Sequence, residues 1–263
     1  TSPKPDSLEA MAKATTSRSI HPARIMGLVC LWGFTSLGCG YYHYAGPLQP
    51  AIQQPDRIVI QGDNTVSFNQ GQLQVELRPL TDAELNRQFA THSTDGPASM
   101  NPYTFGDTRF WEGEKTRQRF TTFRLRVTND GFPKVKIDPS RIVLKAGGAE
   151  YWSLNLQQLD TYYRAYAIGF RGNEYSRYQE RLDILRRTLY KNEEIFIDQQ
   201  VEGYVVFPML HHSVGNVELV IHDAVLRFDH RNEPVETVEI ECHFERDVGR
   251  IYRDGRLDLD MAG

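Results

Sequence analysis

The feature that most constrains the fold is a series of short segments in which apolar and polar residues alternate. In "RFTTFRLRVTN", residues 119–129, Phe123, Leu125 and Val127 alternate with polar residues. A period of two places successive side chains on opposite faces of an extended chain, so this segment is predicted to be a half-buried strand. Similar runs occur at 57–60, 65–68, 72–77, 134–139, 141–148, 202–208, 217–229 and 236–246. Short strands separated by turn residues predict an antiparallel β-sandwich. Among them, "TDAELNRQF" begins with Thr81 and has Glu84 three residues later, a capping-box signature that predicts a short helix.

Three of these segments carry a resemblance to a known group of proteins. They are "FRLRVTNDG", "KIDPSRIVLKAGGAEY" and "VEGYVVFP". Together they resemble the immunoglobulin-like modules of bacterial envelope lipoproteins, in which a strand ending in V-x-N precedes a turn, a second strand and a later G-x-V-x-F strand. The resemblance covers residues 70–246. It implies an immunoglobulin-like sandwich in an extracytoplasmic binding or structural module, and it carries over no catalytic residue.

A long insertion at residues 155–192 interrupts the strand series and reads as a helical hairpin joined near residues 169–172. In its second half, apolar residues recur at spacings of three and four, which is typical of one face of a helix. These residues are Tyr175, Tyr178, Leu182, Leu185 and Leu189. The other face carries Arg177, Arg181, Arg186, Arg187 and Lys191.

Two interpretations of the hairpin remain open. In the first, the apolar face packs on the sandwich and the basic face is solvated. In the second, the hairpin binds a partner protein, because interface cores favour tyrosine and arginine. The residues predicted to contact that partner are Tyr162, Tyr163, Tyr166, Arg177 and Arg181.

The segment at residues 92–117 is predicted to be a long loop. Loops of this length are uncommon in a compact domain unless they are functional or disordered. Its aromatic residues, Tyr103, Phe105, Phe110 and Trp111, argue against simple disorder. They either cover an open end of the sandwich or contact a ligand or partner, and Tyr103, Phe105 and Trp111 are the predicted contact residues.

An apolar run of residues precedes the strand series, from Ile25 to Cys39. A membrane-spanning helix needs about 20 apolar residues, and this run is shorter. The upstream basic residues, Lys13, Arg18 and Arg24, make the segment typical of a signal peptide. An uncleaved signal anchor, extended through the tyrosines at 41, 42 and 44, is the alternative.

The run ends in "TSLGCG", residues 35–40, which resembles the lipobox of bacterial lipoproteins. The resemblance implies cleavage before Cys39 and lipid attachment to this cysteine, although Ser36 and Leu37 depart from the commonest residues. Acyl chains contribute about 0.8 kcal/mol per buried methylene, so a multiply acylated cysteine anchors a domain firmly to a bilayer. Gly40 after the cysteine implies the outer membrane, by resemblance to the enterobacterial sorting pattern.

These features predict four parts of the chain. Residues 1–39 are expected to be a cleaved leader and residues 40–56, with three prolines, a flexible tether. Residues 57–253 are expected to form the sandwich with its helical insertion, and residues 254–263 a polar tail.

Composition and motifs argue against several functions. A net charge of −4 does not indicate a nucleic-acid binder. Cys242 lies on the apolar face of "VEIECHFE", where a thiol is usually inert. The sequence contains no G-x-S-x-G, phosphate-binding glycine loop or H-E-x-x-H motif. The adjacent His211 and His212 are weak joint ligands unless they lie in a loop, so no metal, cofactor or catalytic residue is predicted.

The sequence therefore predicts a non-enzymatic lipoprotein of the outer membrane that faces the periplasm or the cell surface. It is expected to act as a structural or protein-binding module, as an accessory subunit of a membrane-associated assembly. The alternative is a periplasmic ligand-binding or hydrolase-like domain held by an uncleaved signal anchor.

Overall fold

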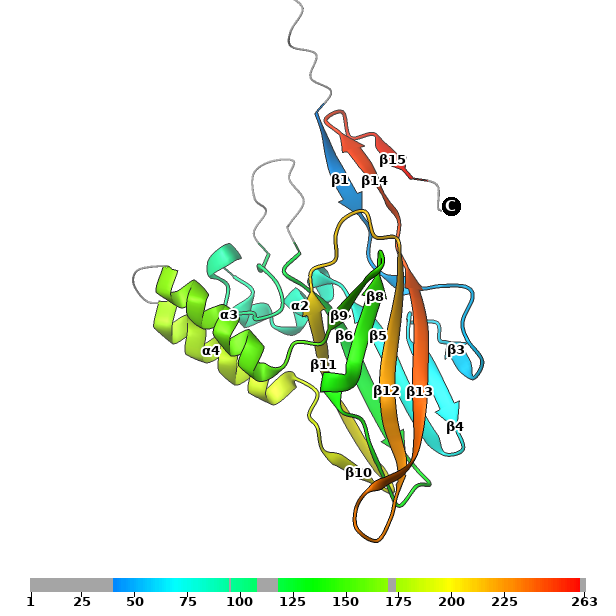
Figure 1. Cartoon of the computed structure of the whole chain (residues 1–263). Coiled ribbons are helices and arrows are strands. Elements are labelled where there is room, and N and C mark those ends of the chain that lie inside the picture. The colour runs from blue at the N-terminus through cyan, green and yellow to red at the C-terminus, as the bar shows by residue number, and fades with distance from the viewer. Residues whose placement is uncertain (1–39, 95, 108–117, 170–173, 261–263) are drawn as a thin grey trace, which may run out of the picture. The chain divides into compact units, whose positions relative to one another are not determined.

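The computed structural model describes residues 40–94, 96–107, 118–169 and 174–260 (Figure 1). Within them the protein is mainly antiparallel β structure with three α-helices. The predicted leader, with Cys39, and Trp111 lie outside the described residues, as does the side chain of Tyr166. Among the helices that the structure describes, none has both the length and the apolarity needed to cross a bilayer.

The first sheet has five antiparallel strands in the order β11-β6-β5-β4-β3. Strand β6 aligns its Val127 with Val75 of β5 on one side and with Val201 of β11 on the other. The alternation of apolar residues thus places matching side chains on one face of the sheet. The strands are β3 (Ile58–Ile60), β4 (Val66–Gln70), β5 (Leu73–Leu80), β6 (Phe120–Asn129) and β11 (Gln199–Pro208).

The second sheet is built around the long strand β12 (Asn216–Phe228), which pairs with β13 (Pro234–Glu245) along one edge. Its other edge pairs first with β8 (Ile142–Ala146) and then with β7 (Lys134–Lys136). The register of β12 shifts between Ile221 and Ala224, where Asp223 has a φ of 50°. The sheet is completed by β2 (Gln49–Pro50), β9 (Ala149–Trp152) and β10 (Glu194–Phe196).

The two sheets share one hydrophobic core. Phe123 and Leu125 of the first sheet and Leu219 and Ile240 of the second belong to the same cluster of buried side chains. Cys242 lies in this cluster with 1% of its surface exposed, which confirms its predicted place on the apolar face. The alternating pattern of the sequence therefore predicts the interior of the protein correctly.

The helices form where the sequence predicts them. Helix α2 (Asp82–Gln88) begins at Thr81, and the predicted capping box between Thr81 and Glu84 is present. Helices α3 (Leu156–Gly169) and α4 (Glu174–Thr188) confirm the predicted hairpin. They lie beside β11 in Figure 1.

A second hydrophobic cluster joins the hairpin to the first sheet. Tyr204 and Val206 of β11 contact this cluster, whereas Val205 belongs to the core between the sheets. Leu159 of α3 and Leu185 of α4 supply the helical side. The second half of β11, residues 203–207, is therefore buried on both faces, and the hairpin covers part of the outer face of the first sheet.

The predicted tether and tail are partly wrong. Strand β1 (Tyr41–Ala45) pairs antiparallel with β14 (Val248–Tyr252), which also pairs with β15 (Leu257–Leu259). The close approach of these strands requires Gly249, where a Cβ atom would lie 2.2 Å from the carbonyl oxygen of Asp258. The tether was mispredicted because its strand partner lies about 200 residues away in the chain.

Candidate functional site

The hairpin contains a buried arginine that ties α4 to the segment preceding β6. Arg181 is fully buried, and its Nε and Nη2 donate hydrogen bonds of 3.0 Å and 2.7 Å to the carbonyl oxygen of Ser99. Its guanidinium lies 5.3 Å from the ring centroid of Tyr163. The Tyr163 hydroxyl donates to the carbonyl of Pro102 and accepts a 3.1 Å hydrogen bond from Nη1 of Arg119. Burial raises the pKa of Tyr163 to about 12, so the hydroxyl stays protonated.

Three of the predicted partner contacts are therefore interior residues. Arg181, Tyr163 and Tyr103 are each 0% exposed, so a partner cannot contact them in this conformation, and their prediction as surface contacts is wrong. Arg181 lies three residues from the buried Tyr178 and four from the buried Leu185, on the apolar face of α4. This spacing can be read from the sequence, but because arginine is charged, Arg181 was predicted to lie on the solvated face of α4.

The remaining predicted contacts differ in exposure. Tyr162 is 41% exposed. Phe105 is half-buried, and the guanidinium carbon of Arg119 lies 4.2 Å from the centroid of the Phe105 ring. Arg177 is half-buried and donates a 2.7 Å hydrogen bond to Glu174. Among these three residues only Tyr162 is exposed.

Several exposed apolar residues in the same region were missed. Ile168 is 79% exposed and Tyr175 is 70% exposed, although Tyr175 was assigned to the packed face of α4. We define the hairpin surface by the exposed apolar side chains between β9 and the start of α4, which are Trp152, Leu156, Tyr162, Ile168 and Tyr175. Their exposure depends on which side of each helix meets β11, and the sequence alone does not specify this.

A groove adjoins the hairpin surface at Leu156. It has a volume of about 420 Å³ and runs between the start of α3, the end of α4 and the edge of β11. The backbone of this edge is already used, because Tyr204 and Val206 accept hydrogen bonds from the N–H groups of Tyr190 and Leu154. The groove therefore offers side-chain contacts rather than a free strand edge.

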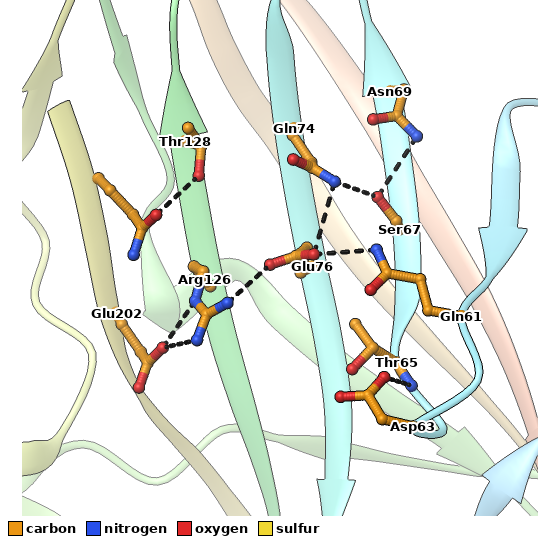
Figure 2. Close-up of polar contacts among 11 residues, drawn as sticks. Gln61, Asp63, Thr65, Ser67, Asn69, Gln74, Glu76, Arg126, Thr128 and Glu202 are labelled. Carbon is orange, nitrogen blue, oxygen red and sulfur yellow. Dashed lines mark hydrogen bonds and ion pairs between the residues drawn. The ribbon is translucent and has the colours of Figure 1, made fainter. Parts of the chain in front are cut away.

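The part of the first sheet beyond the hairpin has a polar outer face (Figure 2). Arg126 lies between Glu202 and Glu76, at 2.7 Å and 3.3 Å from their carboxylate oxygens. Glu76 accepts a 3.0 Å hydrogen bond from Gln61. This row of polar contacts, here called the polar ladder, continues through Gln74, whose amide donates a 3.1 Å hydrogen bond to Ser67. Its polar groups bond to one another and leave few apolar contacts for a partner.

Two clusters could bind a metal ion by residue type. The first joins Glu218, Glu241 and His243, whose ligand atoms lie within 4.8 Å of one another. In it, Glu218 accepts a 2.7 Å hydrogen bond from Lys145, and Nε2 of His243 lies 2.6 Å from Glu241. Each acid thus has a hydrogen-bonding partner within the protein, and these contacts account for the cluster.

The second cluster brings His211 and His212 together with His43 of β1. The ring of His212 lies 3.7 Å from that of His43 and 3.9 Å from that of His211, measured between centroids. Partial burial lowers the pKa of His212, and the neighbouring His43, His211 and Arg246 lower it further. The ring of His212 stacks on that of His43 and is tilted against that of His211, and both are packing contacts. The sequence left open whether the histidine pair lies in a loop, and the structure places it between β11 and β12. The third histidine was not expected.

Comparison of the chain with protein-family models, with curated proteins and with solved structures gave no match. The arguments for function therefore rest on the residues and contacts described above.

Proposed function

We propose that this protein is a non-enzymatic, lipid-anchored envelope protein that binds another protein through its hairpin surface. The observation that carries the proposal is the exposure of Tyr162, Ile168 and Tyr175 on a helical hairpin whose inner side is well packed. Large contiguous apolar patches are typical of interaction sites, and in this proposal the partner covers the exposed apolar side chains of the hairpin.

The chemistry of the hairpin surface is that of a protein interface. Tyrosine, tryptophan and arginine are enriched at the centres of interfaces, and Trp152, Tyr162 and Tyr175 belong to this class. Burying apolar surface contributes roughly 25 cal/mol per Å², so these side chains gain free energy when a partner covers them. The polar ladder of Figure 2 lacks such groups and serves as the contrasting face.

The buried network beneath the surface supports binding by holding the hairpin in one conformation. Arg181 and Tyr163 connect α3 and α4 to residues 99–102 through hydrogen bonds. A surface that is already ordered loses less conformational entropy on binding. Arg181 and Tyr163 were predicted to contact the partner directly, and in this proposal they instead hold the hairpin in place.

The proposed attachment rests on the lipobox resemblance around Cys39, within an immunoglobulin-like β-sandwich protein of the outer membrane that faces the periplasm. Two antiparallel sheets that share one core support the sandwich part of this proposal. The function of the anchor would be to keep the hairpin surface close to membrane-associated partners.

Site-specific photo-crosslinking tests the proposed binding surface. A photoreactive phenylalanine analogue is introduced at Tyr162 or Tyr175 and, as matched controls, at Thr128 or Gln200 on the polar face. In the native membrane, we expect an adduct of defined mass from the hairpin positions only, and its loss in an Ile168→Asp background. Adducts of equal yield from both faces, or from neither, would contradict the proposal.

Metabolic labelling with a palmitate analogue tests the anchor separately. The wild-type chain should be labelled, and the Cys39→Ala chain should remain unlabelled and uncleaved. Normal labelling of the Cys39→Ala variant would refute lipid attachment at this residue, whatever the outcome of the crosslinking.

A further inference from the structure

A pocket of about 210 Å³ opens where the two sheets end together. Residues 45–48, between β1 and β2, form one wall, and the end of β5 with the start of α2 forms another. The start of β6 and Arg246, the residue after β13, complete it. Segments that are far apart in the sequence thus meet around one cavity, which is distinct from the hairpin surface.

The pocket carries an acid and a base that do not neutralise each other. Burial raises the pKa of Asp82 to about 7 against the opposing charge of Arg119, whereas burial lowers the pKa of Arg246. Among the described residues no ion pair joins Asp82 to Arg246. Arg246 is held in place by hydrogen bonds of 2.8 Å and 2.7 Å to the carbonyl oxygens of Val214 and His211.

A buried hydroxyl lines the same pocket. Thr121 is 2% exposed, and its hydroxyl has no hydrogen-bond partner among the described residues. It lies on the same face of β6 as Phe123, toward the space between the sheets, whereas Thr122 lies on the opposite face with Phe120. Buried polar groups are nearly always hydrogen-bonded, so a hydroxyl without a partner beside a cavity indicates that a bound molecule supplies it. This observation is independent of the two charges.

We propose that this pocket binds a small dipolar molecule, a free amino acid or a similar compound that carries an ammonium and a carboxylate group. The ammonium group contacts Asp82 and the carboxylate contacts Arg246, because a carboxylate accepts from ammonium and a guanidinium donates to carboxylate. The Thr121 hydroxyl satisfies one of the remaining polar atoms of the ligand.

The size and the walls of the pocket fit such a ligand. At about 30 Å³ for each water, the volume equals that of about seven water molecules, which is the size of an amino acid rather than of a peptide or a nucleotide. Leu48, Leu80, Pro47 and Pro79 provide apolar walls for a short aliphatic side chain. A mostly apolar cavity with a few converging polar groups is typical of small-molecule sites.

Isothermal titration calorimetry on the full-length chain in detergent tests the proposal. The common L-amino acids are screened first by the thermal shift that each one causes. For leucine as the example, the matched probes are 3-methylbutylamine, which lacks the carboxylate, and 4-methylpentanoate, which lacks the amine. We expect at least one amino acid to bind, and each of its one-ended analogues to bind at least tenfold more weakly.

Two conservative variants assign the contacts. Asp82→Asn should weaken binding at least tenfold, and Thr121→Val should weaken it severalfold. The exposed Asp56→Asn is the matched control and should leave binding unchanged. Thermal unfolding without ligand verifies that each variant is folded, since Asp82→Asn removes a buried carboxyl and should not lower stability at pH 7.5.

Proton release provides a further readout. An ammonium group favours the ionised form of Asp82, so binding near pH 7 should release a fraction of a proton and make the heat depend on the buffer. No binding by any amino acid would overturn the proposal. Equal binding of the amine alone, or unchanged binding by Asp82→Asn, would overturn it as well.

Discussion

Arg181 allows a quantitative test of how the hairpin is held. Its guanidinium is fully buried, donates two hydrogen bonds to the carbonyl of Ser99 and lies 3.8 Å from Glu174. Hydrogen bonds to charged groups contribute about 1.5–3 kcal/mol each, and removing one member of a buried charged network costs about 3–5 kcal/mol. We therefore expect Arg181→Met, which keeps an unbranched side chain, to lower the free energy of unfolding by about 3–5 kcal/mol.

The matched control is Arg177→Met, one turn earlier on α4. Arg177 also bonds to Glu174, at 2.7 Å, but its side chain is 34% exposed. Partly exposed ion pairs contribute about 0–1 kcal/mol, so this variant should change stability by less than about 1 kcal/mol. The contrast between the two variants tests burial rather than charge.

Urea unfolding followed by tryptophan fluorescence measures both effects. With an m-value of about 2–3 kcal/mol/M, Arg181→Met should lower the urea midpoint by about 1–2 M. A loss below about 1 kcal/mol, or equal losses for the two variants, would refute the reasoning that Arg181 is a structural residue of the hairpin.

Three further predictions concern the fold. Gly203→Ala should lower the thermal midpoint strongly, because its Cβ atom would lie 2.4 Å from the Cα atom of Tyr190, and overpacking costs about 1–3 kcal/mol or more; an unchanged midpoint would contradict the close approach. Burial raises the pKa of Cys242 to about 12, so a maleimide at pH 8 should label this residue only after unfolding, as mapped by mass spectrometry; rapid labelling of the native protein would disprove its burial. The pKa of His212 is lower in the folded protein than in the unfolded chain, so the unfolded chain binds a proton at this residue more tightly. The contribution of neutral His212 to stability is therefore complete above about pH 6.5 and is lost as the pH falls below that value. His212→Gln should therefore reduce the loss of urea midpoint between pH 7.5 and 5.0, and an identical loss in the variant would exclude this histidine as the cause.

Local patterns in the sequence predicted most of the elements. The alternation around Phe123 predicted β6, and the spacing of Tyr178, Leu182 and Leu185 predicted the buried face of α4. The capping residues Thr81 and Glu84 predicted the start of α2. These predictions were confirmed because the period of side-chain burial is set by backbone geometry within a single strand or helix.

The candidate sites were predicted less well. Of the residues first expected to contact a partner, Tyr162 is exposed, whereas Tyr103, Tyr163 and Arg181 are buried. The sequence indicated which residue types an interface prefers but not which side of each helix faces outward. The proposed ligand pocket was not predicted at all, because Asp82 and Arg246 are 164 residues apart in the chain.

The sequence by itself therefore determined the periodic elements and the residues of the main core. Only the tertiary structure decided that β1 pairs with β14, that Arg181 turns inward, and that a loop, a helix start and a strand end enclose one pocket. The physical reason is that burial within an element depends on neighbours in the chain. Pairing and cavities depend instead on contacts between distant segments, whose loop-closure entropy and packing no local pattern specifies.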